Sequence, residues 1–207
     1  MRRLFKGVFD RLGFHSTALI GVLIVVSVVM QIRSPYFLTP ANIEVTLTGF
    51  ILEAIMAVGM TLVIISGGID LSVSSVLPFS AIVVALLMTA GVPVAVAVVV
   101  TLLLATLVGV INATLKTVLD VHPFIATLAM MLTIRGVAVV LSGGENISGF
   151  PEAFAVLGQG RFLGMPISIW AFLLLAIVFG VLLHHHRFFQ QIYFIGYDPR
   201  AARVSGI

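Results

Sequence analysis

The chain has 207 residues, of which 60% are hydrophobic and 9% are charged, and its formal net charge is +3. Soluble domains carry about 25% charged residues, so this composition excludes a soluble enzyme and a nucleic-acid-binding domain. The sequence has no cysteine, which excludes disulfides and thiolate metal sites. We therefore predict an integral membrane protein, whose basic residues separate apolar runs instead of forming a basic patch.

The first 14 residues form a basic segment before the first apolar run. Leu4, Phe5 and Val8 fall on one helical face, whereas Arg2 and Arg3 fall on the other. This pattern is typical of a helix that lies in the lipid headgroup layer. An ordinary basic flank explains the same residues equally well, and both interpretations stay open.

Six apolar runs follow in chain order. A helix needs about 20 apolar residues to cross a hydrocarbon core of about 30 Å. The runs that meet this requirement approximately are residues 16–32, 43–65, 71–90, 92–115, 123–141 and 167–184. We expect an all-α polytopic bundle of about six spans, with residues 15–184 as its membrane domain and residues 185–207 as a cytoplasmic segment.

The distribution of Lys and Arg sets the orientation. With the N-terminus inside, the cytoplasmic segments hold eight Lys and Arg residues and the outside loops hold two. Positively charged flanks stay cytoplasmic. We therefore expect both ends of the chain on the cytoplasmic side.

Two charges and one amide lie within the expected spans. Glu53 belongs to the second span, Arg135 to the fifth and Asn112 to the fourth. An unpaired charge at the bilayer centre costs about 2.5–3.5 kcal/mol on insertion scales. The alternatives are a Glu53–Arg135 ion pair, a polar solute pathway, or an Arg135 side chain that reaches outward to the interface; Asn112 belongs to the pathway or links helices.

Glycines and an acid interrupt the apolar sequence between the second and third spans. The interruption contains Gly67, Gly68, Asp70 and Ser72. Broken backbone near membrane depth is tolerated where it is buried or lines water, and such breaks mark solute pathways. Asp70 also suits a simpler role, as the cap of the following helix.

The fourth span carries small residues at every fourth position. Ala105, Gly109 and Ala113 share one helical face, and small residues let a second helix approach closely. We expect this face to pack against another helix of the same chain.

The sequence contains no motif for hydrolysis or nucleotide binding. The consecutive residues His184, His185 and His186 point about 100° apart on a helix and do not converge on a metal. We expect no catalytic residue, no metal site and no cofactor.

Three stretches resemble one known family. They are residues 54–64 continuing through 67–73, residues 123–128 leading to Arg135 and Gly136, and Gly196 followed by residues 201–207. In this order they closely resemble the membrane permeases of bacterial ABC sugar importers of the ribose, xylose and galactose type. Tyr197, Asp198 and Arg200 depart from the usual pattern of that family.

The resemblance implies a translocation subunit of the bacterial inner membrane. Its partners would be cytoplasmic ABC ATPase subunits, a second permease chain and a periplasmic sugar-binding protein. A coupling segment would seat in the ATPase, and its residues would be Gly196, Ala201, Ala202, Arg203, Ser205 and Gly206.

Permeases of that family have about ten spans, so we expect this chain to correspond to their N-terminal part. The expected solute is a carbohydrate or a similar small polar compound. The alternatives are a branched-chain amino-acid permease, a non-transporting fragment of a split or decayed permease, and an ion-driven secondary transporter.

Overall fold

The computed structural model describes residues 2–207, except for the side chains of residues 2–15 and of Leu157. The chain forms two compact units, Met1–Phe50 and Ile51–Ile207. The boundary falls inside one helix, α2 (Pro40–Ile65). The proposed apolar face of the first 14 residues lies outside the described side chains.

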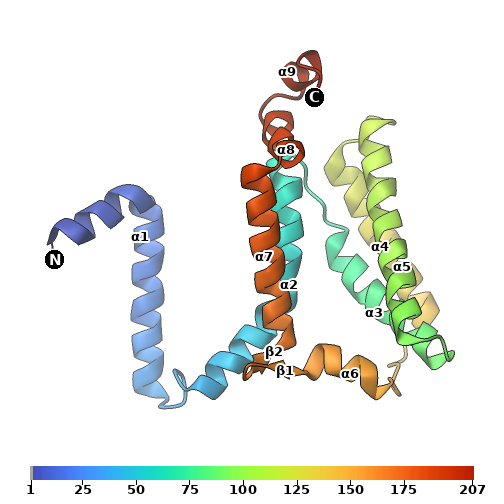
Figure 1. The fold of residues 1–207 in the computed structure, drawn as a ribbon, viewed down its shortest axis with the longest axis horizontal. Coiled ribbons are helices and arrows are strands. Elements are labelled where there is room, and N and C mark those ends of the chain that lie inside the picture. The colour runs from blue at the N-terminus through green and yellow to red at the C-terminus, as the bar shows by residue number, and fades with distance from the viewer. Residues whose placement is uncertain (1) are drawn as a thin grey trace. The chain divides into compact units, whose positions relative to one another are not determined.

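The first unit contains α1 (Arg2–Arg33), a turn and the beginning of α2 (Figure 1). Side chains hold the turn, because Gln31 Oε1 accepts from Leu38 N at 2.9 Å and Asn42 Nδ2 donates to the carbonyl of Phe37 at 2.7 Å. The helix α2 begins three residues before the expected start at residue 43. Thr39 and Pro40 explain this early start, since a threonine N-cap followed by proline favours helix initiation.

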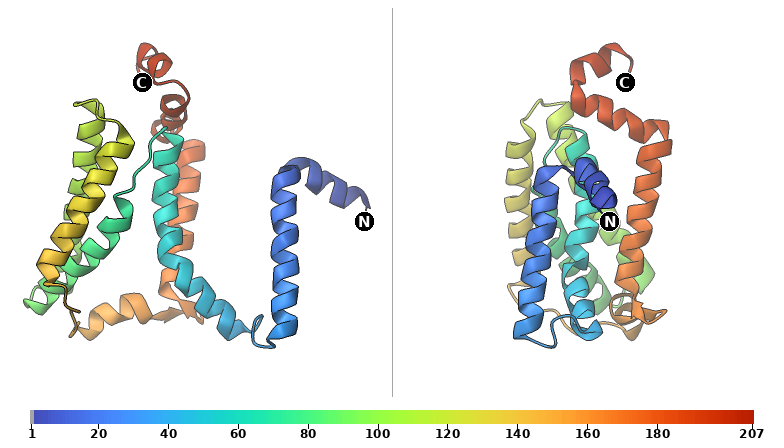
Figure 2. Two further views of the ribbon diagram at one scale, coloured as in Figure 1. Left: turned by 180° about the vertical axis from the view of Figure 1, so that it is seen from behind. Right: turned by 90° about the vertical axis from the view of Figure 1, so that its left-hand side faces the viewer.

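The second unit holds the remaining elements in an almost entirely helical arrangement (Figures 1 and 2). After the end of α2 they are α3 (Val73–Thr89), α4 (Val94–Thr117), α5 (Pro123–Ser142), α6 (Glu152–Gln159), β1 (Arg161–Phe162), β2 (Met165–Pro166), α7 (Ile167–His185), α8 (Arg187–Tyr197) and α9 (Pro199–Val204).

The core of this unit lies where α3, α4 and α5 pack against one another. Its main buried cluster contains Phe79 and Val83 from α3, Val108 from α4, and Ile134 and Ala138 from α5. Since lipid is as apolar as these side chains, close packing is what stabilises the helix contacts. The three helices therefore form a compact support beside the α2–α3 connection.

The third expected span differs from the other five. Among the residues that the structure describes, five helices are long and apolar enough to cross a membrane, whereas α3 is an apolar helix of 17 residues. At 1.5 Å per residue, α3 is about 26 Å long and falls short of the hydrocarbon core. Figure 1 shows the irregular residues 68–71 running from the end of α2 to the start of α3, so the third expected span combines an irregular stretch with a short helix.

The segment between α5 and α7 contains structure that the sequence did not reveal. The strands β1 and β2 form an antiparallel hairpin in which Arg161 pairs with Pro166, and Trp170 Nε1 donates to the carbonyl of Phe162 at 2.9 Å. Two-residue strands are too short to show an alternating apolar pattern. The sequence pattern therefore predicts no strand in this segment.

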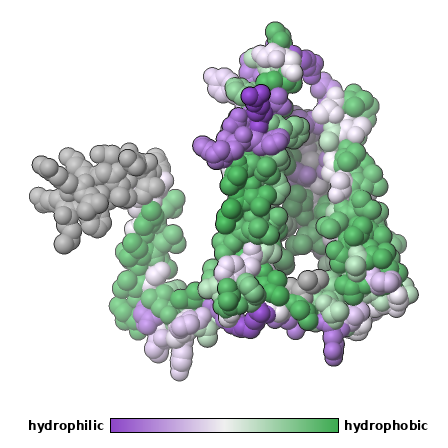
Figure 3. All heavy atoms as spheres, viewed as in Figure 1, coloured by the Kyte–Doolittle hydropathy of each residue, from purple (hydrophilic) through white to green (hydrophobic). Residues whose placement is uncertain are grey.

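The long helices of the second unit are apolar along most of their length and polar near their ends (Figure 3). Large apolar side chains stay exposed, such as Val140 at 81% and Leu174 at 63%. This distribution matches the five spans and confirms an all-α polytopic membrane fold.

Cysteine labelling tests the third crossing and the orientation, because the chain has no native cysteine. Glu145 and Tyr197 are both exposed, on either side of α7. With six crossings and the N-terminus inside, a membrane-impermeant maleimide labels Glu145→Cys in intact cells and Tyr197→Cys only after permeabilisation. Labelling of Tyr197→Cys in intact cells contradicts this topology, since five crossings place the C-terminal segment outside.

Candidate functional site

The helix α2 ends in a glycine turn. Gly67 N donates to the carbonyl of Ile64 at 2.9 Å, and Gly68 N donates to the carbonyl of Val63 at 2.9 Å. Gly67 has φ +72°, in the left-handed region that glycine adopts without steric cost. These two bonds form a Schellman motif, which satisfies helix carbonyls that have no partner within the helix.

Asp70 organises the start of α3. Its Oδ1 accepts from Ser72 N at 2.8 Å and from Ser72 Oγ at 2.6 Å. The carboxylate therefore forms a local turn with the N-cap residue Ser72, and it does not accept from the first N–H groups of α3 itself. The predicted role of Asp70 as the cap of this helix is therefore wrong: the N-cap is Ser72, whose carbonyl accepts from the N–H groups of Ser75 and Val76.

Two neighbouring helices supply further polar contacts to the break. Asn112 Nδ2 on α4 donates to Ser72 Oγ at 2.9 Å. Thr127 Oγ1 on α5 donates to the carbonyl of Pro123 at 2.8 Å and lies 3.3 Å from the carbonyl oxygen of Ile69. Ser72 is 1% exposed, Asn112 7% and Thr127 5%. The break is therefore linked to the three-helix core through buried side chains.

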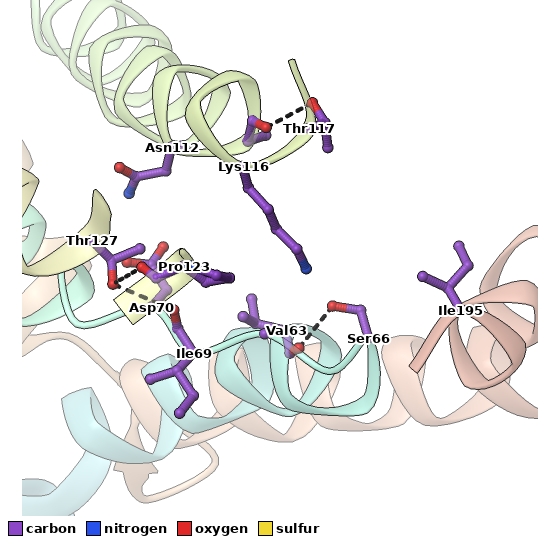
Figure 4. Close-up of a pocket in the computed structure, with 13 residues that line it drawn as sticks. Val63, Ser66, Ile69, Asp70, Asn112, Lys116, Thr117, Pro123, Thr127 and Ile195 are labelled. Atoms are coloured by element: carbon purple, nitrogen blue, oxygen red, sulfur yellow. Dashed lines mark hydrogen bonds between the residues drawn. The ribbon is translucent and has the colours of Figure 1, made fainter. Parts of the chain in front are cut away.

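A cavity of about 340 Å³ lies beside the break. Its polar lining residues include Asp70, Asn112, Lys116 and Thr127 (Figure 4). In Figure 4, Lys116 extends from α4 towards the end of α2, near Val63 and Ser66. A second cavity of about 610 Å³ shares Ser66, Lys116, Thr117, Pro123 and Ile195 with the first, and continues to Gly196, Pro199 and Arg203.

The helix α8 approaches the break through Gly196. A Cβ added at Gly196 would overlap the carbonyl oxygen of Ile65 and lie 3.1 Å from Gly67 N. Only glycine fits this contact between two backbones. The fold therefore brings Gly196, expected in the coupling segment, against Gly67 of the interrupted helix.

The rest of the expected coupling segment forms α9. Asp198 Oδ1 accepts from Arg200 N at 2.9 Å and from Ala201 N at 3.0 Å, which caps the helix start. Ala202 is buried, whereas Ala201 and Arg203 are exposed. Ser205 and Gly206 follow the helix and are also exposed.

Glu53 and Arg135 are not brought together. Both residues are exposed, and no ion pair joins them in the part of the chain that the structure describes.

The small-residue face of α4 does not pack closely against another helix at Gly109, as was expected, because no atom lies within 4 Å of a Cβ added there. Gly109 instead lines the cavity beside the break.

Sequence reasoning missed two residues of this cavity. In the sequence, Lys116 is one of the eight basic residues assigned to the cytoplasmic segments. Thr127 belongs to the stretch 123–128 that resembles the permease family, and no separate role was expected for it. The signal for Lys116 was its position four residues after Asn112, since residues at this spacing share a helical face. No local pattern shows that Thr127 faces the carbonyl of Ile69.

The contact at Gly196 gives a stability prediction. Gly196→Ala pushes α8 away from α2 and lowers the unfolding free energy by about 1–3 kcal/mol, as overpacking does. Gly180→Ala in α7 is the matched control, because no atom lies within 4 Å of its added Cβ. Thermal unfolding in detergent measures both. Equal melting temperatures for the two variants contradict the close contact.

The bond between Asn112 and Ser72 gives a second prediction. In a double-mutant cycle of Asn112→Ala and Ser72→Ala, we expect a coupling free energy of about 0.6–1.7 kcal/mol, the range for hydrogen bonds between membrane helices. Unfolding of the purified chain in mixed micelles provides the four values. Strictly additive effects argue against this link between the break and α4.

The chain is similar to known import permeases. It is 37% identical over 205 residues to the ribose import permease protein RbsC of Bacillus subtilis (strain 168), covering 98% of this chain and 62% of that protein. It is 39% identical over 194 residues to the ribose import permease protein RbsC of Escherichia coli (strain K12), covering 92% of this chain and 60% of that protein.

A third relative is the autoinducer 2 import system permease protein LsrD of Enterobacter sp. (strain 638), with 34% identity over 203 residues, 95% of this chain and 62% of that protein. The chain thus spans about three fifths of the length of these curated relatives. No solved structure matches the chain.

These relatives and the apolar spans confirm a multi-pass protein of the bacterial inner membrane. A family model described as the permease component of the branched-chain amino acid transport system matches residues 42–207. Because this match covers most of the sequence, the chain belongs to that family of ABC importer permeases.

Proposed function

We propose that this chain serves as the non-catalytic translocation subunit of an ABC importer for ribose or a closely related polyhydroxy compound. The similarity to import permeases for ribose and autoinducer 2 over nearly the whole chain carries this proposal. The sequence lacks a phosphate-binding loop, so ATP hydrolysis is assigned to separate ATPase chains.

A second permease chain is the proposed neighbour of the exposed intramembrane charges. Glu53 and Arg135 are exposed on α2 and α5. A lipid-facing charge at membrane depth costs about 2.5–3.5 kcal/mol on insertion scales. A second chain, or a water-filled path between the two chains, removes this cost.

The proposed ATPase contact is α9 with the residues that follow it. The coupling residues Ala201, Arg203, Ser205 and Gly206 are exposed and available to a cytoplasmic partner. A displacement of α9 reaches α8, since these helices contact each other. Gly196 then carries the displacement to Ile65 and Gly67, on either side of Ser66, which lines both cavities.

In this scheme, nucleotide and a loaded periplasmic binding protein shift the protein between inward-open and outward-open states. Each ligand shifts the equilibrium only by its difference in affinity for the two states. Gly67, Gly68, Asp70, Ser72 and Asn112 would form the inner part of the solute path.

A branched-chain amino acid is the second candidate solute, because the family description names that transport system. The relatives described above favour ribose, since two of the three are ribose permeases. A non-transporting role, in which the chain acts only as a partner of other permease segments, is the third candidate.

Uptake by the assembled importer tests the function. The protein that contains this chain is reconstituted with the ATPase and the periplasmic binding protein of its own genome. We expect ATP-dependent accumulation of labelled ribose, inhibition by vanadate, and little accumulation of leucine. Leucine accumulation without ribose accumulation would overturn the sugar assignment, and no accumulation of either solute would favour the non-transporting role.

A further inference from the structure

We propose that the cavity between Asp70 and Lys116 binds a neutral polyhydroxy compound inside the membrane subunit, with the carboxylate and the ammonium on opposite sides of the ligand. This inference rests on the proposed function and deepens it, because it assigns a sugar site to this chain itself.

The two charged groups line one cavity without pairing. Asp70 and Lys116 both line the space of about 340 Å³. In the part of the chain that the structure describes, no hydrogen bond or ion pair engages the Lys116 ammonium. Opposite charges that are held apart across a cavity favour a ligand that bridges them, because each charge then recovers part of its lost solvation.

The hydrogen-bonding capacity on each side is defined. Asp70 uses Oδ1 for its two bonds to Ser72, which leaves Oδ2 as a free acceptor among the described residues. The Lys116 ammonium offers up to three donors and no acceptor. A hydroxyl group both donates and accepts, so neighbouring hydroxyls of one ligand satisfy the carboxylate and the ammonium together.

The charge balance selects against ions. One carboxylate and one ammonium give the cavity no net charge, so binding of a single cation or anion leaves one charge unpaired. A neutral ligand avoids this cost. The remaining walls include Val63, Ile69 and Pro123, which suit the C–H surface of a sugar ring.

The site has a route to the cytoplasm. Lys116 and Ile195 line both the inner cavity and the second cavity, which reaches Arg203. Ile195 precedes Gly196, the residue that touches the end of α2. A displacement of α8 therefore changes the boundary between the ligand site and the outlet.

Lysine labelling tests the site, because the sequence has only two lysines, Lys6 and Lys116. In a Lys6→Arg background of the protein in nanodiscs, trinitrobenzenesulfonate modifies Lys116, and peptide mass spectrometry measures the rate. We expect ribose to slow this modification in a saturable manner and leucine to have no effect. Protection by leucine but not by ribose overturns the proposal in favour of a zwitterion site.

Asp70→Asn is the decisive variant, because an amide keeps an Oδ1 acceptor for Ser72 and replaces the free Oδ2 by a donor. We expect the ribose concentration for half-protection to rise about tenfold or more, as for a lost hydrogen bond to a charged group. Glu152→Gln on α6 is the matched control and leaves protection unchanged. Equal protection in both variants overturns the role of Asp70.

Lys116→Met gives an independent measurement by direct binding of labelled ribose. We expect about tenfold weaker binding with an unchanged melting temperature, since no described residue bonds to the ammonium. Unchanged binding overturns the role of Lys116. If the assembled importer accumulates ribose but ribose never protects Lys116, only this site is wrong; if ribose is not transported at all, the proposed function fails as well.

Discussion

The structure depends on how the polar backbone between α2 and α3 is satisfied inside an apolar protein. Backbone groups without partners cost several kcal/mol each in a membrane interior. The glycine turn at Gly67 and Gly68 satisfies carbonyls of α2, and Asp70 accepts from the backbone and the side chain of Ser72. Thr127 lies close to the carbonyl of Ile69 and joins α5 to the same stretch. The interruption is therefore a specified structural element, and the helix that follows it, α3, has 17 residues.

The same interruption separates two sets of contacts. On one side, Asn112 and Thr127 tie it to the packed helices α3, α4 and α5. On the other side, the backbone of Gly196 in α8 meets the backbone at the end of α2. Side-chain packing resists displacement because interiors are dense, whereas two glycine-containing backbones present a smooth surface. The cavities lie between these two sides, where a movement of α8 changes their shape most directly.

Much of the fold follows from the sequence because a bilayer imposes simple length and charge requirements. For five spans, the bounds predicted from the apolar runs lie close to those of the helices. The stretch after Gly196 likewise predicted where α9 lies. The small residues of α4 were misinterpreted, since Gly109 and Ala113 line a cavity. A stripe of small residues permits a close helix contact but does not supply the second helix. The Glu53–Arg135 pair was also unsupported, because antiparallel spans place residues at similar depth without fixing which helices are neighbours.

By itself, the sequence determined that the chain is a multi-pass helical membrane protein. It also showed where the apolar sequence is interrupted between two spans and which residues are chemically unusual. These properties depend on composition, periodicity and local turn chemistry, and all of them are read from neighbouring residues. Only the tertiary structure decided that Asn112 reaches Ser72, that Lys116 and Asp70 line one cavity, and that Gly196 touches the end of α2. Each of these contacts joins residues about 40 or more positions apart, or on different helices, and depends on how the helices rotate and pack. Hydropathy leaves that rotation undetermined because nearly every face of these helices is apolar.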